Sequence, residues 1–172
     1  MEFDQVIKTR FSCRNFSSEE IDNEKIEEIL KAAILAPSSG NVQDWRFAIV
    51  KDEKIKEKIA DACFGQNFIK KAPVIILIFS DLEEIGSHYG ERGKNVYSYL
   101  NAGGAIENLM LKATDLGLAT CFIGAFSEEK IREIFSFNEN IKPIAIIPLG
   151  YCLDSPSLKS RKKLEEVIIF RK

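Results

Sequence analysis

The sequence predicts an α+β protein in which a central β-sheet lies between two helical layers, a three-layer helix–sheet–helix sandwich. Three observations support this fold class. The segment 73–80, PVIILIFS, is almost continuously apolar, as expected for a central strand covered on both faces. Strand and helix patterns alternate along the chain without a regular βαβ succession. The sequence contains neither G-x-G-x-x-G nor G-x-x-x-x-G-K, so a standard dinucleotide fold or a P-loop is not indicated.

The first third of the chain reads as three helices and one strand. Residues 2–9 have the pattern of a short helix. Over residues 23–36 apolar side chains recur at helical spacing, with Asp22 as a cap and a proline just beyond the end. The segment 45–51, WRFAIVK, predicts a strand, and Asp52 after it is expected to cap a third helix.

The elements after the central strand alternate in the same irregular way. Residues 81–94 are polar and contain glycine, which predicts a loop. A long helix is expected over residues 96–116, ended by a glycine, and a strand over 118–124. Ser127 is expected to cap a short helix. Two last strands are predicted at residues 143–151 and 165–170.

The composition indicates one ordinary globular domain, residues 1–172, with 45% apolar residues. The formal net charge of −2 argues against a general binder of nucleic acid or of a membrane surface. No apolar run approaches the roughly 18 residues of a membrane span. The N-terminus lacks the apolar region of a signal peptide, so we expect a cytoplasmic protein.

The four cysteines have no CxxC spacing, and the chain has one histidine, so no metal site is predicted. In a cytoplasmic protein, such cysteines are expected to be reduced thiols that are buried or half-buried. They are Cys13, Cys63, Cys121 and Cys152.

Two basic segments are candidates for holding a phosphate. In RFSCRNF, residues 10–16, Arg10 and Arg14 flank Ser12, and these side chains match the donors that phosphate oxygens accept. Near the C-terminus, SLKSRKK places Lys159 and Arg161 on one side of an extended segment, where both can join Arg10. The alternative is that both segments are solvated basic surface.

Two further segments are candidates for contacting a heterocycle. In APSSGNVQDWRF, residues 36–47, Asn41 and Gln43 are two apart, which in an extended segment puts both amides on one side. In TCFIGAF, residues 120–126, Gly124 lets a ligand approach the main chain closely. A turn before a strand and a sterically required glycine explain the two segments equally well.

In this order, the segments resemble the FMN-dependent nitroreductase family over nearly the whole chain. RFSCRNF is similar to R-R-S-x-R-x-F, and APSSGNVQDWRF is similar to A-P-S-x-x-N-x-Q-P-W-x-F. The stretch LNAGGAIENLMLKATDLGLATCFIGAF resembles the family's long helix and the segment after it, and PLGYC resembles its G-Y-P strand. Four residues depart from the pattern, Phe11 for Arg, Asp44 for Pro, Asn101 for Asp and Cys152 for Pro.

The resemblance implies a mixed, mainly antiparallel sheet and a homodimer with two FMN sites at the interface, where the C-terminal strand reaches the partner. It assigns the phosphate and ribityl chain to a basic set of residues, with Phe11 in the same segment: Arg10, Ser12, Arg14, Lys159 and Arg161. The partner contributes Pro37, Ser38 and Ser39 along the ring. Asn41 hydrogen-bonds the ring, and a main-chain amide of Ile123 or Gly124 faces its reactive nitrogen.

The implied activity is reduction of nitroaromatics, quinones or similar small acceptors by NAD(P)H through ping-pong hydride transfer. FMN carries the chemistry, so no catalytic side chain is expected. The segment 81–94 suggests an open site, with His88, Tyr89 and Arg92 as candidate substrate contacts. Three alternatives remain open: the same fold with a specialised flavin reaction, such as dehalogenation or heterocycle oxidation; a flavin-binding module without turnover; and a plain structural or interaction domain.

Overall fold

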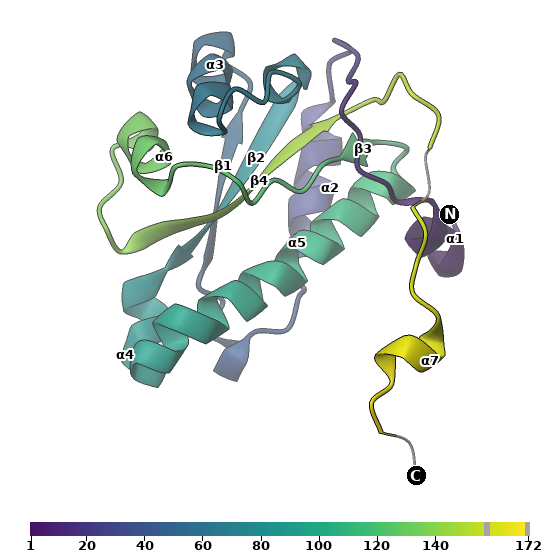
Figure 1. Cartoon of the computed structure of the whole chain (residues 1–172). Coiled ribbons are helices and arrows are strands. Elements are labelled where there is room, and N and C mark those ends of the chain that lie inside the picture. The colour runs from purple at the N-terminus through teal and green to yellow at the C-terminus, as the bar shows by residue number, and fades with distance from the viewer. Residues whose placement is uncertain (157–158, 171–172) are drawn as a thin grey trace.

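The core of the fold is a four-stranded sheet in the order β1-β2-β4-β3 (Figure 1). The computed structural model describes residues 1–156 and 159–170. All three strand pairs are antiparallel. The strands are β1 (Trp45–Val50), β2 (Val74–Asp81), β3 (Ala119–Thr120) and β4 (Ile141–Gly150). A parallel contact occurs in the described part of the chain only as an isolated bridge between Ser12 and Thr120.

Helices cover both faces of this sheet. One core cluster joins the sheet to α2 (Asn23–Ala33) and α5 (Ser98–Asp115), and a second joins it to α3 (Glu53–Ala62) and α6 (Glu128–Phe135). Alternate residues of β2 enter the two clusters, with Ile76 in the first and Leu77 in the second, because successive side chains of a strand point to opposite faces. The predicted three-layer sandwich is confirmed.

Shorter elements connect these layers and extend beyond them. They are α1 (Phe3–Thr9), the 3₁₀ turns η1 (Ser39–Asn41) and η2 (Ile69–Lys71), α4 (Leu82–Arg92), the π-helical turn η3 (Gly93–Tyr97) and α7 (Leu164–Val167). In the described ranges, no helix combines the length and the apolar composition that crossing a membrane requires.

Two of the three predicted helix caps form. The Asp52 side chain accepts a hydrogen bond from the Ile55 amide at 2.9 Å, and Ser127 accepts one from the Lys130 amide at 3.4 Å. Asp22 occupies the N-cap position of α2, but its side chain makes no capping hydrogen bond.

The loop prediction for residues 81–94 is wrong, because most of this segment forms α4. The Asp81 carboxylate caps the helix by accepting a hydrogen bond from the backbone amide of Glu84 at 3.1 Å. Arg46 of β1 forms ion pairs with the side-chain carboxylates of Asp81 and Glu84. Only Ile85 is buried. A surface helix with one buried apolar residue has too little apolar periodicity to be distinguished from a loop.

Two strand predictions also need correction. Within residues 118–124 the ladder with β4 includes only Ala119 and Thr120, followed by an isolated bridge from Ile123 to Ile146. Residues 165–170 do not form a strand: they begin in the one-turn helix α7, whose start is fixed by the Lys163 amide donating to the Glu166 carboxylate at 2.7 Å.

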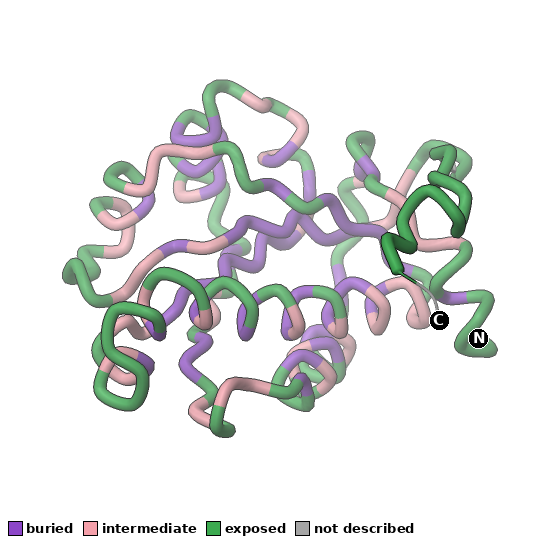
Figure 2. The backbone as a smooth tube through the Cα atoms, turned by 60° about the horizontal axis from the view of Figure 1, so that its bottom comes forward, coloured by how far each residue is buried: buried purple, intermediate pink, exposed green. Residues whose placement is uncertain are grey.

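Residues 159–170, here called the C-terminal arm, stand away from the body of the chain and are exposed throughout (Figures 1 and 2). Ile169 is 100% exposed and Phe170 79%. A strand needs a partner for its backbone groups. The described part of the chain offers this apolar segment none.

Candidate functional site

An open pocket of about 730 Å³ lies between the end of α1, the segment after it and the C-terminal arm. Its lining includes five residues of the two predicted phosphate-binding segments: Arg10, Ser12, Arg14, Lys159 and Arg161. Phe11 also lines it. We call it the basic pocket. The volume lies within the range of about 300–1,000 Å³ that is usual for ligand sites.

Backbone contacts fix the first wall of the basic pocket against the sheet. The Cys13 amide donates to the Thr120 carbonyl at 2.9 Å, beside the bridge from Ser12. The Leu153 amide donates to the Asn15 carbonyl at 2.8 Å. These bonds hold the segment 10–16 between β3 and the chain that leaves β4, so Arg10 and Arg14 enter the pocket from a fixed backbone.

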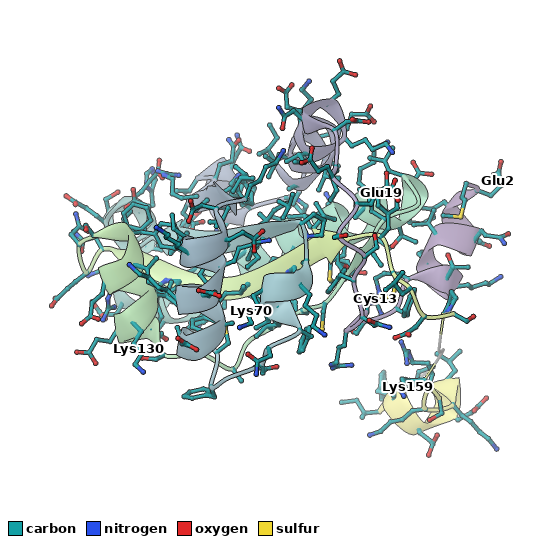
Figure 3. The ribbon with its side chains drawn as sticks, turned by 90° about the horizontal axis from the view of Figure 1, so that it is seen from above. Glu2, Cys13, Glu19, Lys70, Lys130 and Lys159 are labelled. Carbon is teal, nitrogen blue, oxygen red and sulfur yellow. A yellow bond between two sulfur atoms is a disulfide. The ribbon has the colours of Figure 1, made fainter. Side chains whose placement is uncertain are left out.

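A disulfide between Cys13 and Cys152 joins the same two segments, with their Cα atoms 6.0 Å apart. The expectation that all four cysteines are reduced is therefore wrong for this pair, because the fold brings together residues separated by 139 positions in the sequence. Figure 3 labels Cys13 after α1 and Lys159 on the arm. Cys63 and Cys121 are free and buried, and burial raises the pKa of the Cys63 thiol to about 12.

Positive charge dominates the basic pocket. Its lining contains five cationic side chains and one carboxylate, Asp154, which accepts a hydrogen bond from the Asn15 amide group at 2.8 Å. Within the described ranges, none of the five cations has an ion-pair partner within 4 Å. Cations that gather without carboxylate partners favour binding of an anion.

Residues 37–43 form a second polar feature, here called the polar loop. Three of its residues have positive φ angles, namely Gly40 at 57°, Asn41 at 58° and Gln43 at 58°. The segment is therefore not extended, and the expected alignment of the two amides is wrong: the Gln43 side chain donates to the Asn41 carbonyl at 3.1 Å. Non-glycine residues at positive φ are strained and are common in ligand-binding loops.

The polar groups of the polar loop differ in their availability. Ser39 donates from both its amide and its hydroxyl to the Asn101 side chain, at 2.9 and 3.1 Å. The Ser38 hydroxyl accepts from the Gln43 amide at 3.1 Å and keeps its own proton to donate. Asn41 and Pro37 are exposed. Ser38 and Asn41 thus retain donors for a ligand, whereas the Ser39 side chain is occupied within the fold.

Ile123 and Gly124 lie beyond β3. The Ile123 amide donates to the Ile146 carbonyl at 3.0 Å, so it is already used within the sheet. Gly124 is exposed, and its amide has no acceptor within the described ranges. Gly124 is the member of this pair whose amide can meet a ligand.

The basic pocket and the polar loop lie near opposite ends of α5. The loop bonds to Asn101 in the first turn of α5, whereas the pocket segment bonds to β3, which follows the other end of the helix (Figure 1). At 1.5 Å per residue, the helix from Asn101 to Ala113 measures about 18 Å. The structure therefore does not bring these two sets of predicted residues together within one chain.

The sequence did not identify some residues at these features. Lys8 and Ser155 line the basic pocket beside the predicted residues. Asp44, whose carboxylate accepts from the Ser80 hydroxyl and, at 2.6 Å, from the Asn101 side chain, lies buried behind the polar loop. The sequence did contain one sign of the contact between Asp44 and Asn101, because both residues depart from the family pattern.

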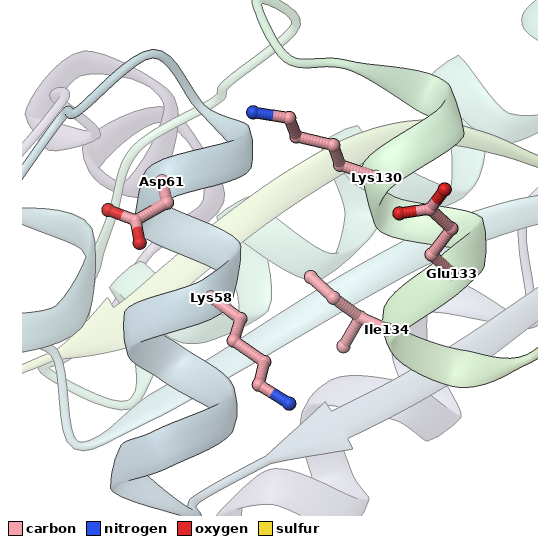
Figure 4. A pocket seen from close by; sticks show the side chains of 5 residues that line it. All are labelled: Lys58, Asp61, Lys130, Glu133 and Ile134. Atoms are coloured by element: carbon pink, nitrogen blue, oxygen red, sulfur yellow. The ribbon is translucent and has the colours of Figure 1, made fainter.

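A second pocket, of about 360 Å³, lies between α3 and α6 (Figure 4). Its lining mixes two lysines, two carboxylates and one isoleucine: Lys58, Asp61, Lys130, Glu133 and Ile134. The charges balance, and no predicted site residue lies there, so this pocket does not suggest a selective site.

The antiparallel sheet between two helical layers is an α+β architecture, and comparison with known proteins gives its class, an NAD(P)H-dependent oxidoreductase of the nitroreductase type. The chain belongs to the nitroreductase family, whose model matches residues 7–72 and 63–151.

Known proteins agree with this assignment. A protein of Archaeoglobus fulgidus, provisionally named NADH dehydrogenase/NAD(P)H nitroreductase, is 34% identical over 157 residues, covering 87% of this chain and 85% of that protein. A nitroreductase family protein from Clostridium difficile 630 has 31% identity and a TM-score of 0.87, covering 100% and 99% of the two chains. One from Streptococcus pneumoniae TIGR4 has 25% identity and a TM-score of 0.90, covering 99% and 100%.

Proposed function

We propose that this chain is a single-domain, FMN-dependent NAD(P)H oxidoreductase of the cytoplasm that reduces nitroaromatics, quinones or similar small acceptors. The observation that carries the proposal is the basic pocket. It brings Arg10, Arg14, Lys159 and Arg161 together from two distant parts of the sequence, without carboxylate partners in the described ranges. A phosphate monoester supplies the two negative charges and the acceptor oxygens that this set matches.

The residues present fit FMN. The basic pocket, with Ser12 and Phe11, would hold the phosphate and ribityl chain. Pro37 and Ser38 would lie along the ring, with Ser39 supporting them from behind. Asn41 and the Gly124 amide would donate to the ring. FMN, when bound, supplies the hydride chemistry, and the protein binds and orients it.

The separation along α5 supports a homodimer. The pocket and the loop lie about 18 Å apart along one helix. They would form one binding site more readily if the pocket of one chain faced the loop of another. Apolar side chains that a partner could cover are exposed near the loop, where Leu35 is 80% exposed and Leu100 64%. The C-terminal arm carries a second such group, which a partner subunit could also cover.

The two substrates would use the same exposed ring face in turn, which gives ping-pong kinetics. The A. fulgidus relative's name supports a reduced nicotinamide as donor. On α4, Tyr89 lies against Gly40 of the polar loop, so it remains a candidate substrate contact together with His88 and Arg92.

The experiment is an absorbance spectrum of the purified protein with FMN, followed by anaerobic titration with NADH and NADPH and then by a quinone. We expect bound flavin that is bleached by a nicotinamide and recovers its colour with the quinone. If the protein binds flavin, but NADH and NADPH bleach this bound flavin no faster than they bleach free FMN, the protein is a flavin-binding module without turnover. Protein that binds no FMN would refute the proposal.

A further inference from the structure

A chain of buried polar side chains connects the sheet to the polar loop through α5. Ser80 of β2 donates from its hydroxyl to one oxygen of the Asp44 carboxylate. The other Asp44 oxygen accepts from the Asn101 side-chain amide at 2.6 Å. Asn101 in turn accepts from both donors of Ser39. Ser80, Asp44 and Asn101 are 0%, 1% and 3% exposed.

This chain of bonds holds a loop that would not keep its shape alone. Of the four residues after Ser39, three have positive φ angles, and two of these three, Asn41 and Gln43, carry side chains. Such a conformation persists where surrounding contacts determine it. Asn101 fixes the loop at Ser39, and the Tyr89 hydroxyl lies so close to Gly40 that a Cβ atom there would clash with it.

We infer that Asp44 and Asn101 are positioning residues, which hold the polar loop in the conformation that binds the FMN of the partner subunit. The inference rests on the proposed function. Neither side chain needs to touch the flavin. Asp44 orients the Asn101 amide, and Asn101 fixes Ser39, which lies between the half-buried Ser38 and the exposed Asn41.

Every donor in the network has an acceptor, and the Asn101 side-chain oxygen accepts both donors of Ser39, which makes a sharp test possible. Asp44 offers two acceptors, and Asn101 offers a donor toward Asp44 and an acceptor toward Ser39. Exchanging the two side chains keeps every bond. The amide then at position 44 would accept from Ser80 and donate to the carboxylate then at position 101, which would accept from Ser39. Asn101→Asp alone would instead set two carboxylates against each other at a 2.6 Å contact.

The test compares the wild type, Asn101→Asp and the double variant Asp44→Asn/Asn101→Asp. For each, FMN affinity is measured by flavin fluorescence, thermal unfolding by circular dichroism and loop order by hydrogen exchange at residues 38–43. We expect Asn101→Asp to weaken FMN binding roughly tenfold or more and to speed exchange in the loop, and the double variant to restore both to about threefold of the wild type or better.

Asn108→Asp is the matched control. Asn108 lies on the same helix, is half-buried and donates to the Ala32 carbonyl at 3.2 Å, outside the network. It is expected to lower thermal stability while leaving FMN affinity unchanged. If Asn108→Asp and Asn101→Asp weaken FMN binding equally at equal loss of stability, the effect is general and the inference is wrong.

The remaining outcomes separate the inference from the proposed function. A folded double variant that fails to recover FMN binding, or an Asn101→Asp variant that binds as the wild type does, overturns the inference and leaves the proposed function intact. Wild-type protein without FMN affinity overturns both, and the hydrogen-exchange comparison then shows separately whether the pair orders the loop.

Discussion

Removing two arginines from the basic pocket, Arg10→Ala with Arg161→Ala, is expected to release FMN. Arg10 is half-buried, and it has no carboxylate partner within the described ranges that could compete with a phosphate. A hydrogen bond between charged groups contributes about 1.5–3 kcal/mol net. Losing Arg10 therefore raises the dissociation constant roughly 10- to 150-fold. Arg161 is exposed and screened by solvent, so it adds a smaller loss.

The assay is quenching of FMN fluorescence on titration with protein, at low and at high salt. The wild type should lose affinity as salt rises, because salt screens the pocket, and the double variant should show a weaker dependence. Lys31→Ala on α2 is the control, since Lys31 is an exposed lysine paired with Glu27 at 3.5 Å. A double variant that binds FMN within about twofold of the wild type would refute the assignment of this pocket to the phosphate.

Three further predictions concern stability. Replacing Cys13 and Cys152 by Ser should lower the free energy of unfolding by about 2–4 kcal/mol and weaken FMN binding, measured by urea titration and fluorescence; equal stability in reducing and oxidising buffer would contradict it. Leu77→Ala in the fully buried central strand should destabilise by about 2–5 kcal/mol, visible as a lower Tm; an unchanged Tm would show that Leu77 is not packed as described. Burial raises the pKa of the Cys63 thiol to about 12, whereas an unfolded thiol ionises near about 8.5. The contribution of this group to the free energy of unfolding is therefore complete below a pH of about 8.5 and falls as pH rises toward 12. Denaturant titrations of the wild type and of Cys63→Ala across this range measure it, and a contribution that grows with rising pH would contradict the prediction.

The sheet and the helices around it follow from local patterns in the sequence. The all-apolar run that becomes β2, the helical spacing in α2 and the capping side chains of Asp52 and Ser127 all depend on neighbours within a few residues. Such signals can be read without knowing the fold. The segment that forms α4 lacks them, because Ile85 is its only buried residue.

The contacts that shape the candidate site come from distant parts of the chain. Cys13 meets Cys152 only because β3 and β4 pair at one end of the sheet, and this proximity is absent from the spacing of the cysteines. Asp44 and Asn101 likewise become partners across 57 positions. The residue types of the candidate site were predictable from the motifs, but which polar groups remain free depended on the folded geometry.

Chain complementation tests the shared site most directly. One chain carries Arg10→Ala/Arg161→Ala and the other Ser38→Ala/Asn41→Ala, and the two are dissociated, mixed and reassembled. In a symmetric dimer with random assortment, half of the dimers are mixed and each has one intact site, so about a quarter of the wild-type FMN sites should return. If dimers mix and flavin binding stays at the level of the separate variants, the pocket and the loop do not form one site across two chains.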